Sequence, residues 1–150
     1  MLVHVMKIGL ISDTHDNIRN IQKVIISFND IQVRVVIHAG DIVSPGTVEA
    51  FDGMRLIGVL GNNDLQIHEL TDAFDRIGGQ LNGEFCEIEQ DNLIFAVYHG
   101  TNSRRKESLI HVANMTWLFV VIHTEFKIKN LEKLCFLILE PQMVGFLDMV

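Results

Sequence analysis

Four short motifs carry side chains that bind divalent metal ions, and each follows an apolar run typical of a buried strand. The motifs are Asp13-Thr14-His15, Gly40-Asp41, Gly61-Asn62-Asn63-Asp64 and His99-Gly100. Because strand ends of an α/β fold direct their loops to one edge of the sheet, these side chains can converge on one site. Carboxylate, carboxamide and imidazole ligands without thiolate suit Mn²⁺, Fe²⁺, Ni²⁺, Zn²⁺ or Mg²⁺ and argue against an iron–sulfur or structural zinc centre. The pattern therefore predicts a hydrolase site for two metal ions.

Each motif alone is weak, since Gly-Asp and Gly-Asn pairs usually mark simple turns. Their joint occurrence at four successive strand ends favours the site. A carboxylate such as that of Asp41 has two oxygens and can bridge two cations about 3.5–4 Å apart. His38, three residues earlier, is either a residue that supports the metal ligands or a packed core histidine, and we favour packing.

Composition limits the class of protein. The chain has 150 residues, 48% of them hydrophobic and 21% charged, which predicts a single domain over residues 1–150. A formal net charge of -7 argues against a broad nucleic-acid or anionic-membrane surface. The two cysteines lie outside any CxxC pattern, and the apolar stretches are too short to span a membrane. We therefore expect a soluble, cytoplasmic protein with no membrane partner, for which nucleic acid is an unfavoured ligand.

Strand and helix signals alternate in the first half and give way to hairpin signals in the second. We expect strands at 5–12, 33–38, 55–60, 80–89, 93–99, 117–122, 126–128, 135–139 and 144–147. We expect helices at 18–28, 46–51, 67–77 and 103–114, the first capped by Asn17. Two hairpins are predicted, one joining 80–89 to 93–99 and one joining 126–128 to 135–139. The order indicates an α/β fold of two packed sheets flanked by helices.

Three segments resemble the calcineurin-like metallophosphoesterases, and most closely their small archaeal and bacterial phosphodiesterase branch. They are Met6 to Asp16, Val36 to Asp41 and Gly61 to Asp64, and the similarity continues in good register to about Gly100. The resemblance implies a four-layer α/β/β/α sandwich of two mixed sheets. It also implies a metal-dependent phosphodiesterase in which a hydroxide held by two ions attacks a small phosphodiester substrate.

The resemblance further implies a ligand set. Asp13, His15 and the bridging Asp41 would hold the first ion, and Asp41, Asn62 and His99 would hold the second. Mn²⁺ is the expected metal, with Ni²⁺, Fe²⁺, Zn²⁺ and Mg²⁺ as alternatives. Asn63 would contact the phosphate as the catalytic residue of this set. In the wider superfamily a histidine usually stands there, so Asn63 brings no titratable proton, which narrows the substrate scope.

The last family motif, Gly-His-x-His, is altered in this chain. The strand at 117–122 leads into His123-Thr124-Glu125, so the motif glycine and one histidine are missing. His123 resembles the first histidine and would serve the second ion, with Glu125 as a substitute ligand for the first. Natural divergence and compensated frameshifts are alternative explanations for this region. A second hypothesis follows from it, namely a catalytically weak or inactive scaffold or binding module of the same fold. A homo-oligomer is compatible with either hypothesis.

Overall fold

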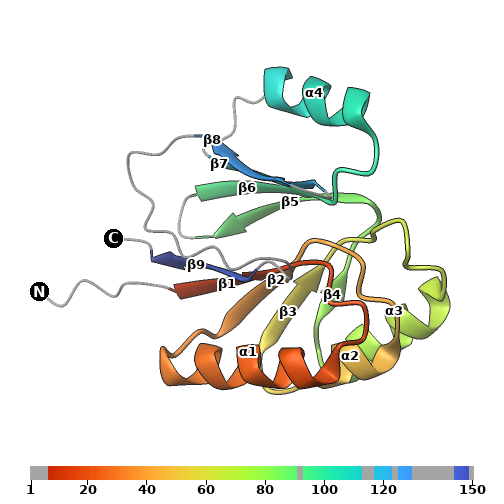
Figure 1. Cartoon of the computed structure of the whole chain (residues 1–150), viewed down its shortest axis with the longest axis vertical. Coiled ribbons are helices and arrows are strands. Elements are labelled where there is room, and N and C mark those ends of the chain that lie inside the picture. The colour runs from red at the N-terminus through yellow and green to blue at the C-terminus, as the bar shows by residue number, and fades with distance from the viewer. Residues whose placement is uncertain (1–6, 91–92, 113–116, 123–124, 130–143, 149–150) are drawn as a thin grey trace, which may run out of the picture.

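Two β-sheets lie face to face, with helices on their outer sides, in the computed structural model of the chain (Figure 1). The structure describes residues 7–90, 93–112, 117–122, 125–129 and 144–148. The first sheet has the order β4-β3-β2-β1-β9 and the second has the order β5-β6-β7-β8. Helices α1, α2 and α3 cover the first sheet, and α4 lies over the second. The predicted four-layer arrangement of two mixed sheets flanked by helices is confirmed.

The first sheet is parallel except at one edge. It contains β1 (Lys7–Ile11), β2 (Val35–His38), β3 (Arg55–Gly58), β4 (Gln80–Leu81) and β9 (Val144–Asp148). β9 pairs antiparallel with β1, and the remaining pairs are parallel. Parallel strands buried on both faces need continuous apolar sequence, and Ile8, Leu10, Val36 and Leu56 are accordingly buried.

The helices on the first sheet follow from amphipathic sequence and local caps. They are α1 (Ile18–Asp30), α2 (Pro45–Glu49) and α3 (Ile67–Arg76). The Asn17 side chain accepts a hydrogen bond from the Asn20 amide at 3.2 Å, which confirms the predicted cap of α1. The ring of Phe28 packs so close to Gly9 that a Cβ there would lie 2.7 Å from it. This close approach fixes α1 against β1, the strand that leads into Asp13.

The second sheet consists of β5 (Phe85–Gln90), β6 (Leu93–Tyr98), β7 (Trp117–Ile122) and β8 (Glu125–Lys129). β5 and β6 form the predicted hairpin, with Phe85 opposite Tyr98 and Gln90 opposite Leu93. β6 and β7 are parallel and are connected through α4 (Ser103–Val112). No helix in the described ranges is long and apolar enough to cross a membrane.

Two sequence predictions about strands need correction or restriction. The single strand expected at 80–89 is wrong, because β4 belongs to the first sheet and β5 to the second. Pairing with β3 keeps residues 80–83 beside the first sheet. The Asn82 amide donates to Gly58 O at 2.8 Å, and Leu60 N donates to Gly83 O at 3.0 Å. For the second predicted hairpin, β8 pairs with β7, and the expected partner at 135–139 lies outside the described residues.

Candidate metal centre

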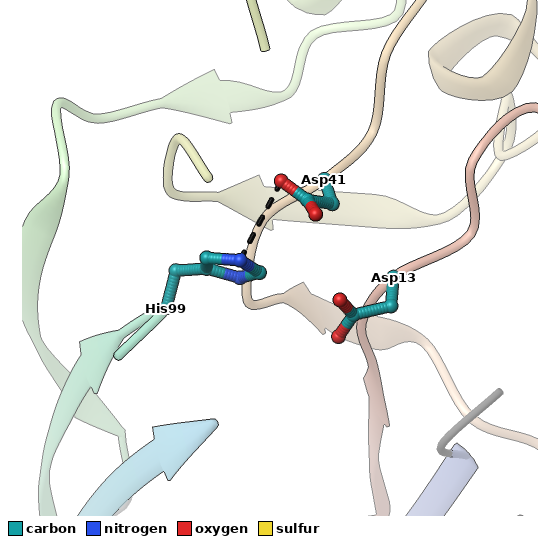
Figure 2. Close-up of side chains that lie close together, drawn as sticks. All are labelled: Asp13, Asp41 and His99. Atoms are coloured by element: carbon teal, nitrogen blue, oxygen red, sulfur yellow. Dashed lines mark ion pairs between the residues drawn. The ribbon is translucent and has the colours of Figure 1, made fainter. Parts of the chain in front are cut away.

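The predicted metal-type side chains meet where strands of both sheets end. Asp13 follows β1, Asp41 follows β2 and His99 directly follows β6. Their side chains point toward one another, as Figure 2 shows, and one ligand atom from each lies within 4.8 Å of the others. The second sheet thus supplies an imidazole that faces carboxylates of the first.

Asp41 lies at the centre of this group and its side chain is fully buried. Its Oδ2 is 3.4 Å from His15 Nε2, and its Oδ1 is 3.5 Å from His99 Nε2. His15 Nε2 also lies 3.8 Å from Asp13 Oδ1. The two carboxylate oxygens of Asp41 therefore face two different imidazoles, and one of these also approaches a second carboxylate.

Asp41 remains ionised despite its burial. Burial by itself raises the pKa of this carboxyl, but hydrogen bonds from Asn63 and the nearby imidazoles of His99 and His15 outweigh it and hold the pKa below its usual value. Asn63 donates its backbone amide to Asp41 Oδ1 at 2.9 Å and its side-chain amide to Oδ2 at 2.7 Å. Asn63 thus orients the central carboxylate at both oxygens.

The imidazole of His99 is held in one tautomer. Its Nδ1 lies 2.9 Å from the carbonyl oxygen of Ala39, an atom that only accepts, so Nδ1 carries the proton. In neutral His99 the lone pair is then on Nε2, which lies 3.2 Å from Asn62 Oδ1. An Nδ1–H bond to a backbone carbonyl is a frequent feature of histidines that bind a metal through Nε2.

The donor set fits divalent metal ions. Two carboxylates, an amide oxygen and imidazole nitrogens face one another, and within the described part of the chain neither Asp13 nor Asp41 forms an ion pair with lysine or arginine. Buried anionic groups require compensating charge, and hard oxygen with imidazole nitrogen is the ligand chemistry of first-row divalent ions.

The backbone that carries these side chains is strained. Asp13, His15 and Asp41 all have positive φ, at 53°, 43° and 57°. Such non-glycine conformations cost about 1–3 kcal/mol each and persist where the surroundings enforce them. Here Asp13 N donates to Gly40 O at 3.0 Å and His15 N donates to Asp41 O at 3.2 Å, so the loops after β1 and β2 hold each other.

His38 also connects the loops after β1 and β2, through hydrogen bonds of both ring nitrogens. It is fully buried, and burial together with nearby His99 lowers its pKa to about 3, so the ring is neutral. Its Nδ1 accepts from Gly40 N at 3.3 Å, which leaves the proton on Nε2 for the Thr14 hydroxyl at 3.0 Å. The favoured interpretation as a core histidine agrees with its burial, and the two hydrogen bonds show that His38 also supports the loops that carry Asp13 and Asp41.

The altered last motif is largely beyond the described residues. His123 lies outside them, and Glu125 is described only as the first residue of β8, whose backbone pairs with Ile122. Asp13, His15, Asp41, Asn62, Asn63 and His99 are therefore the predicted site residues that the structure brings together.

Two acidic residues received no role from the sequence: Asp16, which directly follows Asp13-Thr14-His15, and Asp64, which ends the motif that begins at Gly61. Asp16 Oδ1 accepts from Ser44 Oγ at 2.6 Å and from Thr47 Oγ1 at 2.8 Å, which ties the loop after β1 to α2. Asp64 is buried and bonds three backbone amides of the neighbouring loops. The signal that the sequence offered for both residues was a carboxylate within or next to a motif of candidate metal ligands.

Gly61→Ala is expected to displace Asp41. A Cβ at Gly61 would lie 2.5 Å from Asp41 N and closer still to its Oδ1. We expect a loss of about 1–3 kcal/mol in the free energy of unfolding and roughly tenfold weaker metal binding. Urea unfolding and calorimetric Mn²⁺ titration measure both. Gly83→Ala is the matched control, because a Cβ there meets nothing within 4 Å; equal behaviour of the two variants would contradict the expectation.

Comparison with known proteins places the chain in a family. The model of the calcineurin-like phosphoesterase superfamily domain matches residues 6–124. A protein of Methanocaldococcus jannaschii named Phosphodiesterase MJ0936 is 36% identical over 120 residues, which are 78% of this chain and 70% of that protein. The chain belongs to the calcineurin-like phosphoesterase superfamily, a family of metal-dependent domains.

Solved structures agree with this assignment. An archaeal phosphodiesterase superposes with a TM-score of 0.73 at 32% identity, covering 90% of this chain and 79% of that one. Yfce, a phosphoesterase from E. coli, superposes with a TM-score of 0.51 at 16% identity. The superposition covers 63% of this chain and 58% of the Yfce chain. The second likeness concerns the fold alone.

Proposed function

We propose that this protein is a phosphodiesterase whose site holds two divalent metal ions. The observation that carries the proposal is Asp41, a buried carboxylate whose Oδ2 faces His15 and whose Oδ1 faces His99. Asp13, His15 and Asp41 would hold one ion, and Asp41, Asn62, His99 and His123 the other, with Glu125 as the substitute ligand of the first. When bound, such ions stabilise charge on phosphoryl oxygens and lower the pKa of water enough to supply a nucleophile near neutral pH.

The residues of the chain then have separate tasks. Asp41, kept anionic and oriented by Asn63, would join the two halves of the site. The Asn63 side chain has a second amide hydrogen that can donate to a phosphate oxygen of a small phosphodiester. Backbone N–H groups near Asn63 would add further contacts. A separate general base is not required in this scheme.

Mn²⁺ is the proposed metal, since the site combines hard oxygen with imidazole and lacks thiolate. The direct experiment measures metal content per chain together with hydrolysis of bis(p-nitrophenyl) phosphate, an activated aryl diester. We expect chelator-treated protein to be inactive and to recover with Mn²⁺. Two bound ions without any hydrolysis would overturn the enzymatic proposal.

The second candidate is a scaffold or binding module of the same fold without turnover. The altered sequence around His123 favours it, because one histidine of the family motif is missing there. In that case the protein would leave the aryl diester intact, whether or not it binds metal ions. The same two measurements therefore separate the candidates.

Substrate scope depends on Asn63, which cannot donate a proton to a leaving group. We expect an activated aryl diester to be cleaved far faster than an alkyl diester, because general-acid help worth about 10²–10⁴-fold is missing. Asn63→His should selectively raise the rate on the alkyl diester, and steady-state kinetics of both substrates measure this. Equal rates on the two diesters, with no effect of Asn63→His, would show that no acid is missing.

A further inference from the structure

Asp64 is a buried carboxylate to which the proposed function assigns no role. Its Oδ2 accepts the backbone amides of Asp41 at 2.9 Å and Gly61 at 2.7 Å, and its Oδ1 accepts that of Val43 at 2.7 Å. No ion pair joins Asp64 to a basic side chain in the described ranges, so backbone amides alone compensate its charge. One side chain thus connects the loop after β2 with the loop after β3.

Two of the three amides bonded by Asp64 belong to residues with a strained backbone. Asp41 has φ 57° and Val43 has φ 81°, and Gly40 before them has φ 104°. A positive φ is especially unfavourable for a β-branched residue such as Val43. The two non-glycine residues with positive φ in this loop, Asp41 and Val43, therefore need external support, and the Asp64 carboxylate accepts the backbone amide of each.

The same carboxylate also sets the distance between Asp41 and its orienting residue. Asp41 N and Gly61 N share Asp64 Oδ2, while Asn63, next to Asp64 in the chain, bonds both oxygens of the Asp41 side chain. A shift of Asp64 would therefore move the Asp41 backbone and its side-chain partner relative to each other.

We propose that Asp64 is a positioning residue that holds the Gly40–Val43 loop in its strained conformation and thereby aims the Asp41 carboxylate at the metal site. A purely stabilising residue would affect the whole fold together. A positioning residue changes the Asp41 loop locally and changes metal affinity more than the stability of the core. These consequences distinguish the two roles.

The first test uses the metal-free protein and does not depend on the proposed function. In Asp64→Asn one acceptor oxygen is replaced by an NH₂ group that faces backbone donors. We expect the amides of Asp41, Val43 and Gly61 to exchange hydrogen about tenfold faster or more by NMR, with the core amides of Val36 and Leu56 unchanged. Unchanged exchange at the three loop amides, or an equal change in the core, would overturn the proposal.

The second test rests on the proposed function and measures Mn²⁺ affinity by calorimetry on the full chain. We expect Asp64→Asn to weaken binding by about 10- to 100-fold. Phe74→Leu, a truncation of a fully buried ring in α3, is the control that lowers stability without removing a hydrogen bond of the loop. If Asp64→Asn binds Mn²⁺ as tightly as Phe74→Leu does, the proposal fails.

The outcomes also separate this proposal from the proposed function. Absence of Mn²⁺ binding by the unmodified protein contradicts the proposed function, while the exchange experiment still decides the role of Asp64. Should Asp64→Asn not fold, Asp64→Glu keeps the charge but displaces both oxygens on a longer stem. Faster exchange confined to the three amides in that variant would support the proposal, and unaltered exchange would overturn it.

Discussion

The Asp41→Ala protein is expected to lose both metal ions and with them its hydrolytic activity. Asp41 is the proposed ligand that both ions share, and its two oxygens face His15 on one side and His99 on the other. Removing a residue that only hydrogen-bonds to a metal ligand already weakens metal binding by about 10- to 100-fold. Removing the shared ligand itself should weaken metal binding more. Elemental analysis of the purified variant and its rate on bis(p-nitrophenyl) phosphate measure the effect.

A matched control is available on the surface of α3. Asp75→Ala removes the same chemical group from an exposed position outside the site and should retain the metal content and the rate of the unmodified protein. If the Asp41→Ala protein also retains two ions, the assignment of Asp41 as the bridging ligand is wrong, and the carboxylate of Asp13 becomes the alternative bridge.

Convergence of the motifs was predictable because it depends on strand direction. Asp13, Asp41 and Asn62 follow three neighbouring parallel strands, and the carboxyl ends of such strands meet at one edge. His99 comes from the second sheet, and its approach to Asp41 depends on how the two sheets pack. Its residue type and its position at the end of a strand indicated His99 as a candidate ligand. Its distance from Asp41 could be known only from the structure.

Other features were beyond sequence reasoning for physical reasons. Gln80 to Glu89 contains the turn dipeptide Asn82-Gly83, but the division of this segment between two sheets depends on the tertiary pairing of Asn82 with Gly58. Local propensity disfavours positive φ at Asp13 and Asp41, so their strained backbone is imposed by tertiary hydrogen bonds. The role of Asp64 depends on those same strained amides and could not be inferred without them.

Restoring the family motif after β7 is expected to raise both metal occupancy and turnover. With His123 assigned to the second ion, that ion has four protein ligands: Asp41, Asn62, His99 and His123. The first has Asp13, His15 and Asp41, with Glu125 as a carboxylate in place of an imidazole. Harder oxygen ligation favours Mn²⁺ or Mg²⁺ over Zn²⁺ or Ni²⁺ at the first position. We therefore expect unequal occupancy in the unmodified protein and weak activity that rises with added Mn²⁺.

The combined replacement of Val121→Gly, Ile122→His, His123→Thr and Thr124→His supplies both imidazoles of the motif. Since removing an orienting partner of a metal ligand costs about 10- to 100-fold, gaining a full ligand should raise Mn²⁺ affinity at the first position by about tenfold or more. Metal content, Mn²⁺ titration and the rate on the aryl diester are measured together. Glu125→Gln in the unmodified chain is the companion variant, and it should lower the first-site occupancy only if Glu125 is a ligand. Full two-ion occupancy before the replacement, with no gain in rate after it, would show that the chain already completes its site without a second imidazole.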